Sequence, residues 1–231
     1  MKKITLFSLC LTVVSLGFSQ VYILGGVNLS NITQTTTGQT EKNNLLTTFN
    51  GGIMGRFGLS KTVDLESGLM VMGEGSKAET YFGSGTSDNY VKSRFNPIYL
   101  QIPLNLVLKV PLDKHSNVFF HAGPYTAIGI AGKSTVQSNA LGLNSSSNND
   151  IKFSNDNPFT SKQDDAAYDK LKRFDFGVNA GAGVDLGSLI LRFNYGLGLT
   201  KINSTQSNNG VDDKNKYRTL SISVGIPLSR P

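Results

Sequence analysis

Residues 174–200 read FDFGVNAGAGVDLGSLILRFNYGLGLT, and apolar side chains occupy every second position along most of this stretch. The apolar positions are even-numbered before the Gly187-Ser188 pair and odd-numbered after it. Because successive side chains of a β-strand point to opposite faces, the stretch predicts two strands, each with one apolar face. A two-residue loop that begins with glycine fits a tight hairpin turn. With Leu186 opposite Leu189, both apolar faces lie on the same side of the hairpin.

The same alternation recurs along the rest of the chain. It appears in six further segments: 21–29, 49–59, 63–74, 98–110, 118–130 and 220–228. Short connections (60–62, 111–117 and 187–188) alternate with long polar ones (31–48, 75–96, 131–173 and 201–216). This layout predicts an all-β fold, an eight-stranded antiparallel up-and-down transmembrane β-barrel with short periplasmic turns and long extracellular loops. Residues 134–161, within the longest connection, are polar and are expected to contribute no strand.

Alternation by itself fits a lipid-facing barrel and a soluble, lipocalin-like barrel equally well. None of the positions that we assign to the apolar face is Asp, Glu, Lys or Arg. The other face carries glycine, asparagine and charges of both signs, in place of the lysine- and glutamate-rich coat of a soluble protein. Small residues and paired charges suit the narrow interior of an eight-stranded barrel. We therefore expect the apolar face to contact lipid.

The first nineteen residues are predicted to be a secretory signal peptide, with residues 20–231 forming the barrel domain. Lys2 and Lys3 precede an apolar segment that is too short to span a membrane as a helix, and small residues follow it. Without the two lysines the formal net charge falls from +6 to +4, and the basic residues are scattered. We expect no nucleic-acid partner. Cys10 lies inside the segment, so the mature chain is expected to have no cysteine.

Five segments of this chain resemble one known family. They are GGVNLSNI (25–32), RFGLSKTVDLESGL (56–69), YLQIPLNLVLK (99–109), HAGPY (121–125) and FDFGVNAGAGVDL (174–186). The chain is similar to the PorT-like outer-membrane β-barrel family of Gram-negative bacteria across essentially all of residues 20–231. The resemblance implies an eight-stranded barrel in the cell outer membrane. Most members lack an assigned function, and the member that gives the family its name serves protein secretion.

No catalytic, cofactor or metal site is predicted. The two histidines are His115, in a short turn, and His121, a few residues away, and neither reaches the extracellular rim where a lipid-hydrolysing site would lie. His121 is expected to fill a hydrogen-bonded position in the lumen. No phosphate loop is present, and no cluster with metal-ligand spacing. We expect the protein not to be an enzyme.

Two functional classes fit these observations. The first is a structural or interaction barrel with a closed lumen, whose long loops contact a protein partner or whose body joins a secretion complex or supports envelope integrity. The second is a small pore or a small-ligand-binding barrel. A soluble binding barrel is a more distant third. In the first two readings the barrel is surrounded by outer-membrane lipid and lipopolysaccharide, and a monomer is expected.

Six inward-facing charges are predicted to form an ionic cluster near the periplasmic end. In the second hairpin Arg56 lies across from Glu66, and in the hairpin of residues 174–200 Arg192 lies across from Gly183, which leaves room for a long side chain. Buried charges in so narrow an interior must pair. The predicted members are Arg56, Asp64, Glu66, Lys109, Asp185 and Arg192.

Two prolines fall inside predicted strands. Pro103 and Pro124 each remove one N–H donor from the hydrogen-bond ladder, so we expect a β-bulge at each.

Overall fold

A computed structural model describes residues 20–36, 39–42, 45–82, 89–114, 116–140, 143–157, 159, 170–202 and 216–228. The predicted signal peptide and His115 lie outside the described residues. No helix among the described residues is long and apolar enough to cross a membrane.

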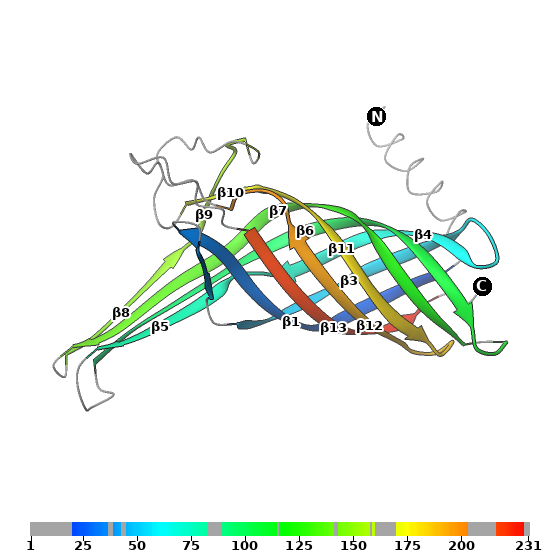
Figure 1. Cartoon of the computed structure of the whole chain (residues 1–231), viewed down its shortest axis with the longest axis horizontal. Helices are drawn as coiled ribbons and strands as arrows, with labels where there is room; N and C mark the ends of the chain where they lie inside the picture. Colours follow the sequence, from blue (N-terminus) through cyan, green and yellow to red (C-terminus); the bar gives the residue numbers. More distant parts are fainter. Residues whose placement is uncertain are drawn as a thin grey trace, which may run out of the picture.

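Eight antiparallel strands form a closed ring (Figure 1). They are β1 (Gln20–Thr36), β3 (Leu46–Gly58), β4 (Val63–Gly73), β6 (Asn89–Pro111), β7 (Asn117–Ala140), β11 (Phe174–Asp185), β12 (Ile190–Gly198) and β13 (Lys216–Pro227). Each strand pairs with its neighbour in the chain order, β1 pairs with β13, and the β6–β7 pairing completes the circle. The predicted eight-stranded up-and-down barrel is therefore confirmed.

The hairpin of residues 174–200 has the predicted register. Val184 lies opposite Leu191 and Ala182 opposite Phe193. The N–H of Leu186 donates to the carbonyl oxygen of Leu189 at 2.9 Å, which closes the two-residue turn. Gly187 has φ +80°, a conformation that favours glycine.

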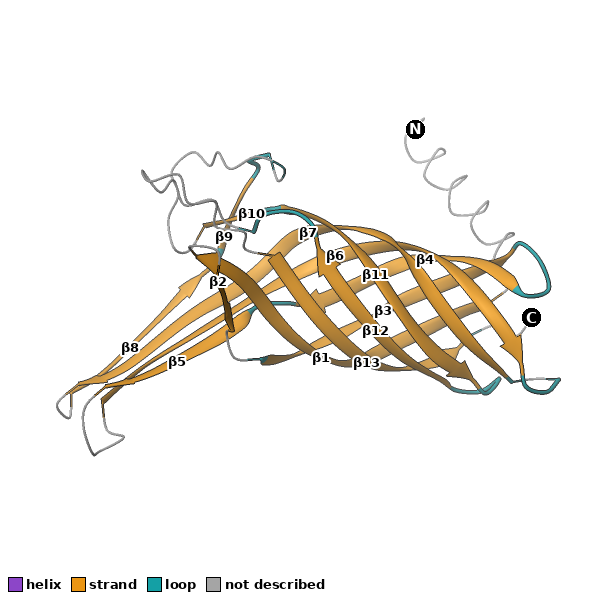
Figure 2. Cartoon of the chain, viewed as in Figure 1, coloured by secondary structure: helices purple, strands orange, loops and turns teal. Residues whose placement is uncertain are grey.

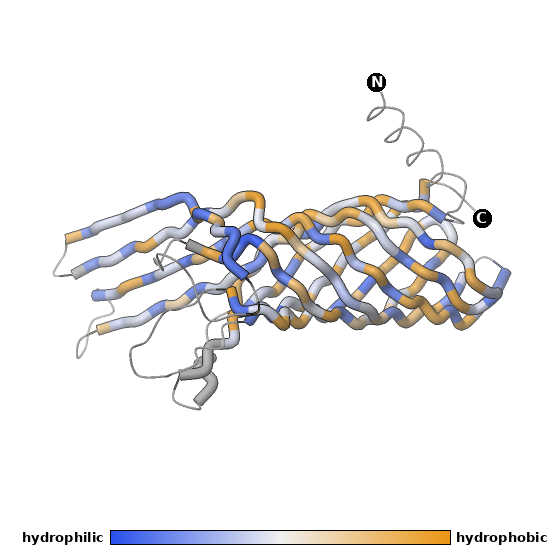
Figure 3. The backbone as a smooth tube through the Cα atoms, turned by 90° about the horizontal axis from the view of Figure 1, so that it is seen from above, coloured by the Kyte–Doolittle hydropathy of each residue, from blue (hydrophilic) through white to orange (hydrophobic). Residues whose placement is uncertain are grey.

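The apolar face of the strands points outward, as predicted. Ile53, Leu104 and Phe193 are 54%, 48% and 53% exposed, whereas Met54 and Asn105, each next in sequence to one of them, are 2% and 0% exposed. Figure 3 shows this as an alternation of hydrophobic and more hydrophilic segments along the barrel strands. Since an apolar outer band covers the barrel, its natural surroundings are lipid.

The three short turns lie together at one end of the barrel, where β1 begins and β13 ends (Figure 2). This is the periplasmic end, and the long connections lie at the extracellular end.

The long connections at the extracellular end are partly strand. Their additional strands are β2 (Gln39–Lys42), β5 (Ser76–Phe82), β8 (Leu143–Asp150), β9 (Lys152–Ser154) and β10 (Lys170–Lys172). The expectation that residues 134–161 contribute no strand was wrong, because they include the end of β7 and all of β8 and β9. β8 in particular is exposed along its whole length, so its sequence carries no apolar alternation.

We call one part of these connections the extracellular sheet: β5, residues 89–97 of β6, residues 132–140 of β7, and β8. These four segments pair in that order and continue past the barrel wall (Figures 1 and 3). β9 and β10 form a separate parallel pair, and β2 pairs with the end of β1.

The expected bulges at the two prolines were wrong. Along β6 and β7 the register is unchanged across Pro103 and Pro124, and the shift lies instead at Ile98/Tyr99. The ladder between β4 and β6 is interrupted near Pro103, where the Ser67 hydroxyl donates to the Pro103 carbonyl oxygen at 2.8 Å. The missing N–H of a proline therefore removes hydrogen bonds of the ladder locally, while the residue pairs on either side keep the register of the strands.

Candidate functional site

Four of the six predicted charges form one buried network that crosses the lumen. The Nε atom of Arg56 donates to Glu66 Oε2 at 3.0 Å, and its Nη1 atom lies 3.4 Å from Asp185 Oδ2. From the far wall, Arg192 Nη1 donates to Glu66 Oε1 at 2.6 Å. Arg56 and Glu66 are 1% and 0% exposed, so water does not screen these pairs. Two arginines and two carboxylates leave this lumen network neutral.

The other two predicted charges form a separate ion pair. Lys109 Nζ lies 2.7 Å from Asp64 Oδ1, and the lysine side chain keeps 23% of its exposure. This pair lines a cavity of about 840 Å³ at the periplasmic end, with Arg56 and Asp185 also on its wall. The lumen network thus closes the barrel at the bottom of a cup that opens toward the periplasm.

Uncharged inward residues complete the lumen network. The Tyr22 hydroxyl donates to Glu66 Oε2 at 2.6 Å, and the Asn105 amide donates to Glu66 Oε1 at 3.0 Å. Gln20 donates to Asp185 at 3.1 Å. Sequence reasoning omitted these three because it selected charged residues only, although all share the inward parity. Glu66 therefore accepts from four side chains, which compensates for its burial.

Aromatic side chains pack against one arginine of the lumen network. The Arg56 guanidinium lies 4.2 Å from the ring centroid of Phe119 and 5.3 Å from that of Tyr22. The Phe119 ring fills the space over Gly183, where an added Cβ would lie 2.3 Å from the ring. The room that Gly183 leaves is thus taken by Phe119, which stacks on Arg56 as a cation–π partner.

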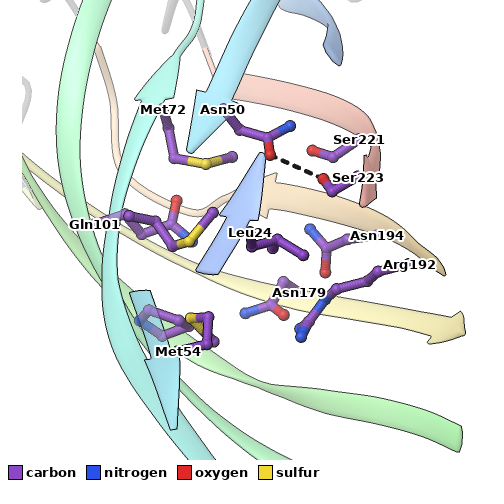
Figure 4. A pocket seen from close by; sticks show the side chains of 12 residues that line it. Leu24, Asn50, Met54, Met72, Gln101, Asn179, Arg192, Asn194, Ser221 and Ser223 are labelled. Carbon is purple, nitrogen blue, oxygen red and sulfur yellow. Dashed lines mark hydrogen bonds between the residues drawn. The ribbon is translucent and has the colours of Figure 1, made fainter. Parts of the chain in front are cut away.

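The middle of the lumen is packed with polar and sulfur-containing side chains. The cavity of Figure 4 has a volume of about 30 Å³, and a second cavity toward the extracellular end has about 10 Å³. Asn50 accepts a hydrogen bond from Ser223 at 2.8 Å across the first cavity. His121 is 3% exposed and its Nε2 atom lies 2.9 Å from Asn194 Oδ1, as expected for a lumen histidine. These volumes hold about one or two water molecules.

The extracellular mouth is closed by an apolar cluster built on three tyrosines, which we call the aromatic cluster. Tyr99, Tyr125 and Tyr217 come from the barrel wall, and residues of the long connections pack onto them. These covering residues are Ile151, Leu171 and Ile202, all less than 10% exposed. Within the described residues, this cluster therefore closes the extracellular end, and the lumen network closes the barrel at the bottom of the periplasmic cup.

Two carboxyl groups are buried beneath that cluster with no cation nearby. Glu74 accepts hydrogen bonds from the hydroxyls of Ser30 and Thr219, and Asp175 accepts from those of Thr200 and Tyr125. Within the described residues, no Lys, Arg or His nitrogen lies within 4.0 Å of either carboxyl group. Their surroundings are thus unlike those of Glu66.

This contrast predicts opposite results for two matched substitutions. Glu74→Gln is expected to leave the free energy of unfolding unchanged or to raise it by about 1 kcal/mol, because it removes a buried charge that no cation compensates. Glu66→Gln is expected to lower it by about 3 kcal/mol, because two buried arginines lose their shared anion. Urea titration in lipid vesicles measures both. A loss of more than about 1 kcal/mol in Glu74→Gln would contradict the prediction.

No group of three or more His, Cys, Asp or Glu side chains within the described ranges is arranged to hold a metal ion.

A protein-family model described as the outer membrane protein beta-barrel domain matches residues 17–204. The chain belongs to this family. Members of the outer membrane protein beta-barrel domain family are small, non-enzymatic barrels, so this protein lies in the outer membrane and is not an enzyme. The PorT-like resemblance is narrower than this family and stays a prediction.

Solved structures of small outer-membrane barrels are similar to this chain over most of its length. Ail, the attachment invasion locus protein of Yersinia pestis, is 12% identical with a TM-score of 0.40, covering 90% of this chain and 98% of Ail. Neisserial surface protein A is 10% identical with a TM-score of 0.40, covering 89% and 96%. OprG from Pseudomonas aeruginosa is 10% identical with a TM-score of 0.36, covering 92% and 97%. Comparison with curated proteins gave no match.

Proposed function

We propose that this protein is a sealed outer-membrane barrel whose working part is the extracellular sheet, which binds a protein partner at the cell surface. A closed lumen is supported by the lumen network at one end, the aromatic cluster at the other and cavities of about 30 and 10 Å³ between them. Such volumes exclude a small organic ligand from the middle of the lumen, because such a ligand needs several hundred Å³. The barrel is thus an anchor, and the six predicted charges are structural.

The observation that carries the proposal is the edge strand β8. Leu143–Asp150 is the last strand of its sheet within the described residues, and all eight of its residues are exposed. An edge strand presents a row of unpaired N–H and carbonyl groups that a partner strand can extend. Proteins usually protect such edges with lysine, proline or a bulge, and β8 (LNSSSNND) contains no lysine and no proline. An unprotected polar edge beyond the membrane suits recognition of an extended peptide segment.

The extracellular sheet also suits removal without loss of the barrel. Val136 lies directly opposite Ser147, so a two-residue Asn-Gly turn can replace residues 137–146. The trimmed variant loses half of β8 and the last four residues of β7 but retains Ile151 and the barrel wall. It is expected to fold, which heat-modifiable migration on a gel measures. Failure to fold would contradict the separation of anchor and working part.

The partner proposal is tested by site-specific photocrosslinking on intact cells. A photoreactive residue at Ser145, in β8, is expected to give a discrete protein adduct that excess purified wild type competes away and excess trimmed variant does not. The same residue at Lys114, in a periplasmic turn, is the matched control. Adducts at Lys114 and none at Ser145 would overturn the proposal and favour a secretion complex at the periplasmic side. Stable ion currents in planar bilayers would overturn the sealed lumen.

A further inference from the structure

Three cationic side chains lie side by side at the base of the extracellular sheet. In the strand register Lys77 of β5 is directly opposite Arg94 of β6. Lys133 of β7 is directly opposite Asn96, so it is the diagonal neighbour of Arg94. Directly opposite residues have Cβ atoms about 5 Å apart, and diagonal ones about 7–8 Å. We call these three residues the basic cluster.

The basic cluster lies on the outward face of the wall. Tyr99 of β6 belongs to the aromatic cluster and Phe95 packs against it, so Arg94, at the opposite parity, points away from the lumen. Lys77 and Lys133 share its face because they pair with Arg94 and Asn96. Along the same face of β6 the next residues toward the periplasm after Asn96 are Ile98 and Leu100, the top of the lipid-facing band.

The level of the basic cluster follows from strand geometry. Arg94 is four residues beyond Ile98, which is about 13 Å along a strand. At a strand tilt of about 45° this is a height of about 9 Å above the apolar band. Lipid headgroups of the outer leaflet occupy this level. On the same face, Lys92 Nζ lies 4.6 Å from the ring centroid of Tyr90, and aromatic residues of this kind flank the apolar band of such barrels.

Within the described residues, a single long ion pair compensates the charge of the basic cluster. Arg94 and Lys133 form no ion pair with any described residue, and Lys77 reaches only Glu79, at 3.9 Å. Asp150 is opposite Lys133 in the register, yet no contact within 4.0 Å joins them. Like charges directly opposite each other destabilise a sheet. The repulsion between Lys77 and Arg94 is relieved when an external anion lies between them.

We propose that Lys77, Arg94 and Lys133 bind the phosphate groups of lipopolysaccharide in the outer leaflet. The acyl chains of the lipid then contact the outward residues Ile98 and Leu100 below, and the phosphates meet the basic cluster above. Arginine suits this role because its planar guanidinium donates two parallel hydrogen bonds to a phosphate. A bound lipid at this position braces the base of the extracellular sheet against the membrane.

The test compares two double variants that each remove two positive charges. Arg94→Gln/Lys133→Gln neutralises the basic cluster. Lys61→Gln/Lys114→Gln is the matched control, because both lysines are exposed in periplasmic turns. Each folded barrel is titrated in detergent with purified bis-phosphorylated lipid A and with the same lipid after enzymatic removal of its phosphates. Native mass spectrometry measures the bound fraction, and heat-modifiable migration verifies folding.

Wild type and control are expected to bind bis-phosphorylated lipid A at least about tenfold more tightly than the dephosphorylated lipid. Arg94→Gln/Lys133→Gln is expected to lose about tenfold or more of that affinity and to bind both lipids alike. Equal affinity of wild type for the two lipids, or an equal loss in the control, would overturn the proposal. Unchanged lipid binding in Arg94→Gln/Lys133→Gln, together with loss of the Ser145 adduct, would assign the basic cluster to an acidic protein partner instead. A lost lipid preference with an unchanged adduct leaves the proposed function standing.

Discussion

Arg56→Ala is expected to lower the free energy of unfolding by about 3–5 kcal/mol, among the largest effects of any single substitution in this barrel. Arg56 is 1% exposed and contacts Glu66 at 3.0 Å and Asp185 at 3.4 Å. Its removal leaves Asp185 without a cation within 4.0 Å among the described residues and Glu66 with Arg192 alone. It also removes the guanidinium that lies 4.2 Å from the centroid of the Phe119 ring. Urea titration in lipid vesicles measures the change.

A double-mutant cycle separates the contact from general damage. Glu66→Ala in the Arg56→Ala background is expected to cost less than Glu66→Ala in wild type, with a coupling free energy of about 1–3 kcal/mol. Lys109→Ala is the control, because Lys109 pairs with Asp64 at the open periplasmic mouth. Its expected cost is about 1 kcal/mol or less, since water screens that pair. Additive costs for Arg56→Ala and Glu66→Ala would show that the two side chains do not interact.

Leu104→Arg is expected to lower the free energy of unfolding in vesicles by about 2–4 kcal/mol and to reduce insertion. Leu104 is 48% exposed and lies midway along the outward apolar run of β6, residues 98–110. An arginine there meets hydrocarbon at the centre of the bilayer, where a charge is most costly.

The matched control is Leu112→Arg, the same substitution in a periplasmic turn. Leu112 is 61% exposed and lies beyond the apolar band, so its expected cost is within about 1 kcal/mol. The difference between the two variants isolates depth in the membrane from the chemistry of the substitution. Equal folding yields in lipid vesicles would mean that Leu104 does not face lipid.

The barrel and much of its register follow from local sequence. In the hairpin of residues 174–200, the alternation with period two and the Gly187-Ser188 turn leave one register in which both apolar faces coincide. The same logic places Arg56 opposite Glu66 in the β3–β4 hairpin. Both predictions succeed because hairpin neighbours are close in the chain and one face must avoid water.

Contacts across the lumen are decided only by closure of the ring. Arg192 reaches Glu66 from a strand 126 residues away, and Tyr22 reaches it from β1. Parity shows that these side chains point inward, but their levels depend on the stagger of all eight strands. Because these levels are not visible in the sequence, the sequence could not predict that the six charges divide into a lumen network and a separate Asp64–Lys109 pair.

The extracellular sheet is likewise a product of the tertiary structure. Sequence alone gave residues 134–161 as polar and strandless, because a strand with water on both faces carries no apolar alternation. The end of β7 pairs because β6 and β7 are already aligned side by side in the barrel, so their ladder continues beyond the membrane. β8 then pairs with the end of β7 as a hairpin. Alternating sequence thus determined the part of the protein that lies in lipid, where one face must be apolar. The structure of the extracellular sheet, which lies in water, depends instead on backbone pairing that extends the register already set by the barrel.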